Sequence, residues 1–169
     1  MTNIDRLWAP WRIKYIETST QKSDGKKDKK CLFCESAKTT RKNYVIFKTK
    51  YSISILNIFP YNNGHIMISP LRQIQKISQL KDAEIIDLFK TLNKVTKLLD
   101  KVLAPDGYNI GINISEIAGA GIPGHLHIHI VPRWKGDTNF MPVLYNTKIM
   151  SQSLDELYKR LKNAYSKRD

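Results

Sequence analysis

Residues 125–132 read His-Leu-His-Ile-His-Ile-Val-Pro and hold three of the four histidines in this 169-residue chain. In an extended strand successive side chains point to opposite faces, so His125, His127 and His129 share one face, roughly 6–7 Å apart. The apolar residues between them face the other way, into a core. A strand face that merely meets solvent is more often filled with Lys, Thr and Glu. Three imidazoles in a row therefore indicate a site that acts on something.

The rest of the chain predicts one α+β domain around this strand. Further strands are expected at 44–47, 51–56, 65–69 and 108–114. Apolar residues recur at helical spacing from Asp82, a candidate cap, to about Leu103, and a capping box at 153–156 opens a terminal helix. The order β-β-β-α-β-β-α favours a mainly antiparallel sheet with one long helix and a C-terminal helix.

We treat residues 1–169 as a single domain with three parts. Residues 1–30 form an N-terminal arm that ends in a charged loop, residues 31–150 form the core, and residues 151–169 form the C-terminal helix. Two tryptophans in the arm, Trp8 and Trp11, suggest that it docks onto the body or onto a partner subunit.

Composition limits the classes of function. No apolar run approaches the ~20 residues of a membrane span, and the first residues lack the apolar segment of a secretory signal, so we expect a cytoplasmic protein without a membrane partner. Lys and Arg outnumber Asp and Glu by 28 to 15, a formal charge of +13. Such a charge attracts nucleotides and other polyanions, but compositional drift explains it equally well, because the excess is spread along the chain.

The two cysteines stand together in Cys31-Leu32-Phe33-Cys34. One CxxC pair in a cytosolic chain suggests half of a metal site or a redox pair, not a disulfide framework. A redox CxxC usually opens a helix within a thioredoxin-like βαβ pattern, which this sequence does not show.

With these motifs the chain resembles the histidine-triad (HIT) family, whose motif is three histidines alternating with apolar residues. The resemblance covers most of residues 31–150 and includes Asn57 followed eight residues later by His65, similar to the family's nucleoside-binding segment. Residues 133–140, Arg-Trp-Lys-Gly-Asp-Thr-Asn-Phe, are similar to the bacterial and archaeal branch related to diadenosine tetraphosphate phosphorylase and hydrolase. That branch also has a Trp-x-Pro-Trp-Arg arm, here residues 8–12, and an early CxxC.

The resemblance implies an enzyme with a nucleotidyl-histidine intermediate. A neutral imidazole is a good nucleophile near pH 7, and by match to the motif His127 attacks the α-phosphorus. A backbone carbonyl at His125 sets the tautomer of His127, and His129 holds phosphate oxygens and assists the leaving group. His65 is either a fourth histidine of the site or a strand histidine satisfied by a backbone carbonyl.

The resemblance also implies the residues that bind substrate. They are Asn57 for the ribose, Ile58 and Phe59 for the base, Asn113, Gly121 and Ile122 for phosphate, and Trp134 for the pocket wall. The backbone amides of the Gly-rich loop at 118–124 can cradle phosphate oxygens, although such loops also serve as turns. Asn57 as a turn former, Asn113 facing solvent and Trp134 packing at the strand end are the competing interpretations.

Two departures from the family pattern concern the acceptor and the metal. Relatives often have hydroxyl side chains before the triad, whereas this chain has Gly121-Ile122-Pro123, which favours water over phosphate as acceptor. Relatives with CxxC complete a zinc site with the first triad histidine and a further histidine where this chain has Gln73, a poor zinc ligand. Cys31, Cys34 and His125 are therefore candidate zinc ligands without an identified fourth.

The resemblance therefore implies a homodimeric hydrolase that cleaves dinucleoside polyphosphates or related nucleotides at the α-phosphate. The chemistry requires no cofactor, although a divalent metal can accompany the substrate polyphosphate. Phosphorolysis of diadenosine tetraphosphate and hydrolysis of nucleoside phosphoramidates share the same nucleophile and remain alternatives. A nucleotide- or RNA-binding module without catalysis is the rival from another class, but an intact triad argues against it and nucleic acid is not the expected partner.

Overall fold

The computed structural model describes residues 31–38, 43–145 and 149–167. The predicted N-terminal arm, residues 1–30, lies outside them. Backbone contacts separate the chain into two units, and the smaller one contributes the short helix α4 (Met141–Tyr145). All other helices and strands of the described residues belong to the larger unit.

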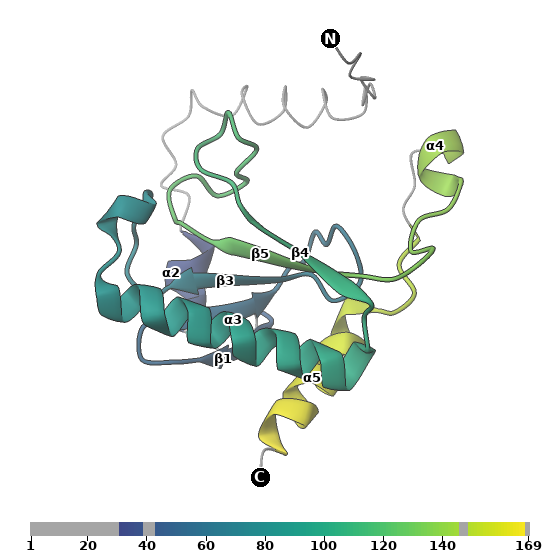
Figure 1. Ribbon diagram of the computed structural model, residues 1–169, viewed down its shortest axis with the longest axis horizontal. Coiled ribbons are helices and arrows are strands. Elements are labelled where there is room, and N and C mark those ends of the chain that lie inside the picture. The colour runs from purple at the N-terminus through teal and green to yellow at the C-terminus, as the bar shows by residue number, and fades with distance from the viewer. Residues whose placement is uncertain (1–30, 39–42, 146–148, 168–169) are drawn as a thin grey trace. The chain divides into compact units, whose positions relative to one another are not determined.

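The larger unit is built on a five-stranded sheet, which confirms the predicted α+β class (Figure 1). The strands are β1 (Val45–Lys48), β2 (Ser52–Leu56), β3 (Ile66–Pro70), β4 (Gly107–Ile112) and β5 (Ile128–Arg133). Their order is β1-β2-β3-β5-β4, and every neighbouring pair is antiparallel. Strand β5 lies between β3 and β4, with His129 opposite Met67 of β3 and Gly111 of β4. The strand expected from His125 begins only at Ile128, because pairing with both neighbours starts there, so His125 and His127 precede β5.

Two predicted helices are present, α3 (Asp82–Leu103) and α5 (Leu154–Ser166). Ser153 caps α5 as predicted, since its side chain accepts a hydrogen bond from the amide of Glu156. The cap expected at Asp82 is wrong by one residue: Lys81 occupies that position, and its amide donates to the Glu84 carboxylate at 2.8 Å. No helix among the described residues has the length and apolar character needed to cross a bilayer.

Two short elements were not predicted. One is the helix α2 (Leu32–Lys38), which contains most of the CxxC motif, and the other is the 3-10 turn η1 (Ile77–Gln79). Both are too short to show a helical repeat of apolar residues. Their positions depend on what they pack against rather than on their own sequences.

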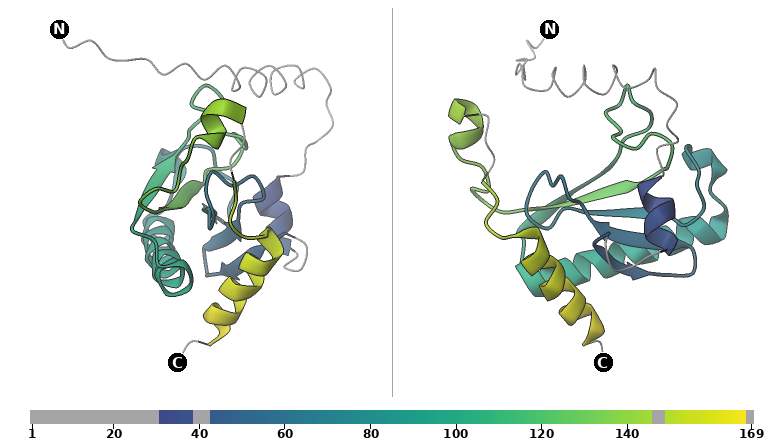
Figure 2. Two further views of the ribbon diagram at one scale, coloured as in Figure 1. Left: turned by 90° about the vertical axis from the view of Figure 1, so that its right-hand side faces the viewer. Right: turned by 180° about the vertical axis from the view of Figure 1, so that it is seen from behind.

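Two apolar clusters cover the two faces of the sheet. Ile66, Ile68, Ile128 and Ile130 pack with residues of α3 and α5. The alternating residues face the other way, where Met67 and Ile55 pack with Phe33 of α2. Figure 2 shows α3 and α2 on opposite sides of the sheet. The histidines alternate with Ile128 and Ile130 and therefore lie on the α2 side.

Candidate active site

The three histidines of the 125–129 stretch form a buried row on the α2 face, as their alternation predicts. The ring centroids of His127 and His129 are 4.8 Å apart. The ring of Phe33 packs against His125 at 5.1 Å and against His127 at 5.3 Å. All three imidazoles are at most 9% exposed. Such burial disfavours the charged form of an imidazole, so the site holds neutral rings.

The backbone determines the tautomer of His127. Its Nδ1 lies 2.8 Å from the carbonyl oxygen of His125, and a carbonyl only accepts, so Nδ1 carries the proton. The Nε2 atom consequently has a free lone pair. Burial lowers the pKa of His127 below its ordinary value, and the bond to the carbonyl opposes part of that shift. A neutral imidazole with an unprotonated Nε2 is a competent nucleophile near neutral pH.

A second chain of hydrogen bonds determines the tautomer of His129. The amide N–H of Tyr61 donates to Nδ1 of His65 at 3.1 Å, so His65 must carry its proton on Nε2. That Nε2 lies 2.9 Å from Nδ1 of His129, which accepts it and leaves the proton of His129 on its own Nε2. No described residue accepts a hydrogen bond from this buried Nε2–H. His129 therefore offers an unused donor next to the lone pair of His127.

The pKa values agree with this arrangement of neutral rings. Burial lowers the pKa of His65 to about 3, and the imidazoles of His129 and His127 act in the same direction. Burial also lowers the pKa of His129 to about 4, with a smaller contribution from His127. Neither ring becomes charged near neutral pH, so each hydrogen bond keeps one direction.

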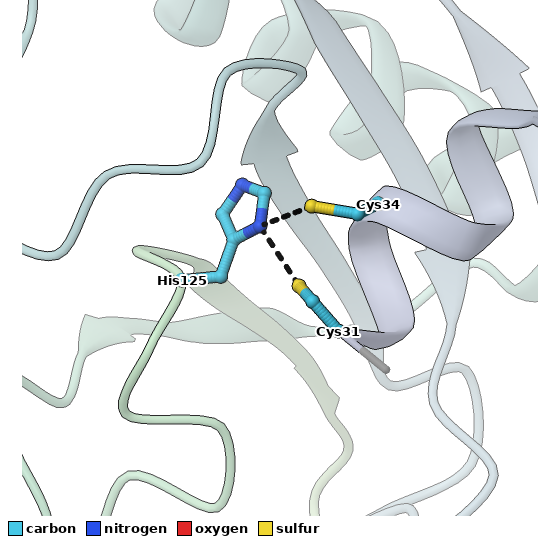
Figure 3. Close-up of side chains that lie close together, drawn as sticks. All are labelled: Cys31, Cys34 and His125. Carbon is cyan, nitrogen blue, oxygen red and sulfur yellow. Dashed lines mark hydrogen bonds between the residues drawn. The ribbon is translucent and has the colours of Figure 1, made fainter. Parts of the chain in front are cut away.

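Figure 3 shows the sulfur atoms of Cys31 and Cys34 both directed at Nδ1 of His125. The two sulfurs lie 3.1 and 3.7 Å from that nitrogen, and the three ligand atoms lie within 4.8 Å of one another. Nε2 of His125 donates to the carbonyl of Pro70 at 2.8 Å, which leaves the Nδ1 lone pair facing the thiols. Two soft sulfurs and an oriented imidazole fit a thiophilic metal ion such as zinc, and this group can bind a metal.

Gln73 occupies the side of this group where the resemblance places a fourth ligand. Its side-chain oxygen lies 3.4 Å from the sulfur of Cys34, and its amide nitrogen donates to the carbonyl of Gly124 at 3.2 Å. Burial and the neighbouring Cys31 raise the pKa of the Cys34 thiol. An amide oxygen is a weak ligand for zinc beside thiolates, so the described residues supply three strong donors to this group.

The predicted nucleoside-binding residues 57–59 follow β2, and their side chains go to different places. Asn57 is 8% exposed, and its side chain bonds to Nδ1 of His65 and to the amide of Phe59. Ile58 lines a cavity of about 130 Å³ beside the start of α5, on the face of the sheet opposite to the histidines. Phe59 is 79% exposed. The assigned contacts with ribose and base stay predictions.

The other predicted substrate residues lie on loops around the histidine row. Asn113 follows β4 directly and contacts the loop carbonyl of Gly119 at 3.5 Å. Gly121 is exposed, and Ile122 packs against the α2-side cluster. Trp134 follows β5 and is half-buried. Their contacts with substrate likewise stay predictions.

Sequence reasoning missed two aromatic residues of the site. Phe33, inside the CxxC motif, packs on His125 and His127. Tyr61 places its ring 4.6 Å from that of His65 and 5.6 Å from that of His129. No periodic pattern extends through either segment. The one signal in the sequence that could have identified these two residues is that they stand next to recognised motifs.

A family model described as HIT domain matches residues 38–136 of this chain. The chain belongs to the HIT family. A relative in Mycobacterium tuberculosis, named AP-4-A phosphorylase, is 30% identical over 97% of this chain and 86% of its own length. The asymmetrical bis(5'-nucleosyl)-tetraphosphatase of Schizosaccharomyces pombe is 34% identical over 60% of this chain and 56% of its own length.

Solved structures of HIT proteins share the fold. A zinc-bound histidine triad family protein from Mycobacterium smegmatis aligns with a TM-score of 0.66 over 81% of this chain and 94% of its own, at 22% identity. The Plasmodium falciparum diadenosine triphosphate hydrolase aligns with a TM-score of 0.57 over 74% of this chain and 76% of its own, at 26% identity. The HIT fold thus accounts for the antiparallel sheet and the helices packed on it.

Proposed function

We propose that this protein is an enzyme that cleaves dinucleoside polyphosphates at an α-phosphorus through a nucleotide attached to His127. The tautomers of His127 and His129 are the observation on which the proposal rests, because they place a lone pair and an N–H donor on two adjacent buried rings. The names of the M. tuberculosis and S. pombe relatives, a phosphorylase and a tetraphosphatase, support this class of substrate.

In the first step Nε2 of His127 attacks the α-phosphorus, and the bond from that phosphorus to the bridging oxygen breaks. Nε2–H of His129 donates to the departing phosphate oxygen, which carries the developing negative charge. In the second step water attacks the phosphorus and gives up a proton to the solvent, the P–N bond breaks, and Nε2 of His127 regains its lone pair. A nucleoside monophosphate is released.

The Gly-rich loop before the triad is suited to hold the phosphates. No hydrogen bond to another described residue occupies the amides of Gly121 and Ile122, so both can donate to phosphate oxygens. Asn113, which follows β4, lies beside the start of β5, where this loop leads into the histidines. The formal charge of +13 favours an anionic substrate in general, and a divalent cation can accompany the polyphosphate.

Water is the proposed acceptor. Phosphorolysis needs a second anion beside the nucleotidylated His127, and therefore several preorganised donors. Residues 121–123 offer no hydroxyl, and Pro123 lacks an N–H. Phosphorolysis is the second candidate, because a relative matched over most of its length is named a phosphorylase.

The deciding experiment is incubation with diadenosine tetraphosphate, with and without inorganic phosphate, followed by separation of AMP, ADP and ATP. We expect AMP and ATP at a rate independent of phosphate. ADP and ATP at a rate that rises with phosphate would identify a phosphorylase. Nucleotide binding without any product would identify a non-catalytic binding module.

We also propose that zinc occupies the Cys31–Cys34–His125 group with partial occupancy. These residues would hold the ion, which would tie α2 to the start of the histidine row. The chemistry at phosphorus would run without it, because His127 and His129 have no contact with the two thiols. The two free cysteines suit a reducing compartment, and we expect a cytoplasmic enzyme.

A homodimer is the proposed assembly. Strand β4 lies at the edge of the sheet, and Tyr108 packs toward α3, so Ile110 and Ile112 lie on the same face. Ile110 is 48% exposed, Ile112 is 38% exposed, and Phe89 of α3 is 65% exposed. Such an apolar surface beside an unpaired strand edge suits a second copy. Sedimentation equilibrium should give a dimer, and Phe89→Glu should shift it toward monomer.

A further inference from the structure

Asn57 holds a defined orientation through two hydrogen bonds inside the protein. Its side-chain oxygen accepts from the amide of Phe59 at 3.0 Å, an Asx turn. Because that oxygen faces Phe59, the Nδ2 group faces Nδ1 of His65, at 3.2 Å. Asn57 is 8% exposed and His65 is fully buried. The Asn57 amide therefore meets an imidazole, away from solvent.

Two donors thus converge on one ring nitrogen, namely the Asn57 amide and the amide N–H of Tyr61. Two N–H donors can share a nitrogen only if that nitrogen has a lone pair. His65 therefore keeps its proton on Nε2 and passes the direction of the hydrogen bond to His129. This series of hydrogen bonds ends at Nε2–H of His129, the buried donor that lacks a partner among the described residues.

We propose that Asn57 is a positioning residue, which acts on the reaction through His65 by reinforcing, together with the Tyr61 amide, the tautomer that makes His129 a donor toward the substrate. The effect on turnover rests on the proposed function, whereas the effect on the tautomers does not. The alternative role for Asn57 is a hydrogen bond to the ribose hydroxyls, for which its second amide N–H would be used.

The loop that carries Tyr61 is held in place by hydrogen bonds to another segment. Next to Tyr61, Asn62 is buried and donates both to the carbonyl of Pro132 at 3.0 Å and to the carboxylate of Asp137 at 2.8 Å. The Asp137 carboxylate also receives two hydrogen bonds from Arg133. The loop that brings the Tyr61 amide to His65 is therefore tied to the end of β5, the strand that carries His129.

The isosteric change Asn57→Asp tests the inference directly. A carboxylate can still accept from the amide of Phe59, but it presents an oxygen instead of a donor to Nδ1 of His65. The proton should then move to Nδ1 or be shared by both ring nitrogens, which removes the direction of the bond to His129. Asn57→Ala removes one donor but keeps the Tyr61 amide, so the tautomer of His65 should persist.

The first measurement is nitrogen-15 NMR of the imidazoles at pH 7, which is tractable because the chain has four histidines. In the unmodified protein, His65 and His129 should both be protonated at Nε2 alone. Asn57→Asp should change the signals of both rings, whereas the control Asn93→Asp, an equal charge change on the exposed face of α3, should change neither. Unchanged signals in Asn57→Asp would overturn the inference whatever the activity.

The second measurement separates positioning from ribose binding. With diadenosine tetraphosphate, Asn57→Asp should lower kcat at least ~10-fold, within the range of general acid catalysis, with KM changed less than ~2-fold. Asn57→Ala should lower kcat only ~2–5-fold, the cost of one weak hydrogen bond. The same ratios should appear with the analogue whose riboses are 2′,3′-dideoxy.

A ribose contact would give the opposite pattern. Both variants would raise KM, and their effects would disappear with the dideoxy analogue, which overturns the positioning role. If Asn57→Asp fails to fold, the kcat of Asn57→Ala on the two substrates decides between the roles. If the unmodified protein turns over neither substrate while the NMR changes are seen, the proposed function fails and the inference about Asn57 stands.

Discussion

The two ends of the histidine row contrast in how completely their polar groups are satisfied. At one end, the His125 carbonyl determines the proton position of His127. The Tyr61 amide and the Asn57 side chain determine that of His65, and through His65 that of His129. At the other end, His125 meets two thiols and the amide of Gln73, a set with one weak member. The same strand motif therefore supports a preorganised chemical centre and an incomplete metal centre. The difference comes from the segments that each end meets.

Removal of the nucleophile should have the largest effect. We expect His127→Ala to lower kcat at least ~10³-fold, since covalent catalysis is lost rather than weakened. Nucleotide binding, measured by calorimetry, should persist, because the loops around the site are unchanged. A variant that keeps more than about a tenth of the activity would show that another group attacks phosphorus.

Acid should destabilise the chemical end of the row through its buried neutral rings. The pKa of His65 is about 3 in the folded protein and ordinary, near 6.5, in the unfolded chain. Below about pH 6.5, His65 binds a proton in the unfolded chain but stays neutral in the folded protein. The free energy of unfolding therefore falls as the pH is lowered to about pH 3. His129, with a pKa of about 4, acts in the same direction.

The slope attributable to His65 is about 1 kcal/mol per pH unit. Urea unfolding between pH 7 and pH 4.5 measures the slope for the protein. His65→Gln, which has no titrating ring, should show a smaller slope. Equal slopes for the two proteins would mean that His65 titrates normally in the folded state.

The metal end should respond to completion of its ligand set. Purified protein should contain less than one zinc per chain by elemental analysis, because Gln73 is a weak ligand beside Cys34. Gln73→His should raise the content toward one equivalent, and Gln73→Ala should not. A full equivalent in the unmodified protein would mean that another residue supplies the fourth ligand.

The smallest effect is expected from removing the thiols. Replacing Cys31 and Cys34 together by Ser should leave kcat within about threefold of the unmodified protein, a change below 1 kcal/mol in the barrier. The reason is that neither thiol touches His127 or His129. A much larger loss of kcat without a loss of thermal stability would show that the two ends of the row act together.

Long periodic segments were predictable. The helix from Asp82 to Leu103 has the predicted limits, because its apolar repeat persists over many turns and packs on one face of the sheet. The capping box at Ser153 placed the start of α5 correctly. The short helix α2 was missed, since its seven residues show no repeat and the packing of Phe33 determines where it lies.

The sequence by itself determined that His125, His127 and His129 share a face, because alternation is a property of any extended strand. It also predicts a zinc-ligand set without a strong fourth member, since Gln73 lacks the chemistry of a zinc ligand whatever its position. Only the tertiary structure decided which nitrogen of each ring carries the proton. That choice depends on the Tyr61 amide and the His125 carbonyl, and backbone groups are the same in every residue until the fold directs them at a partner.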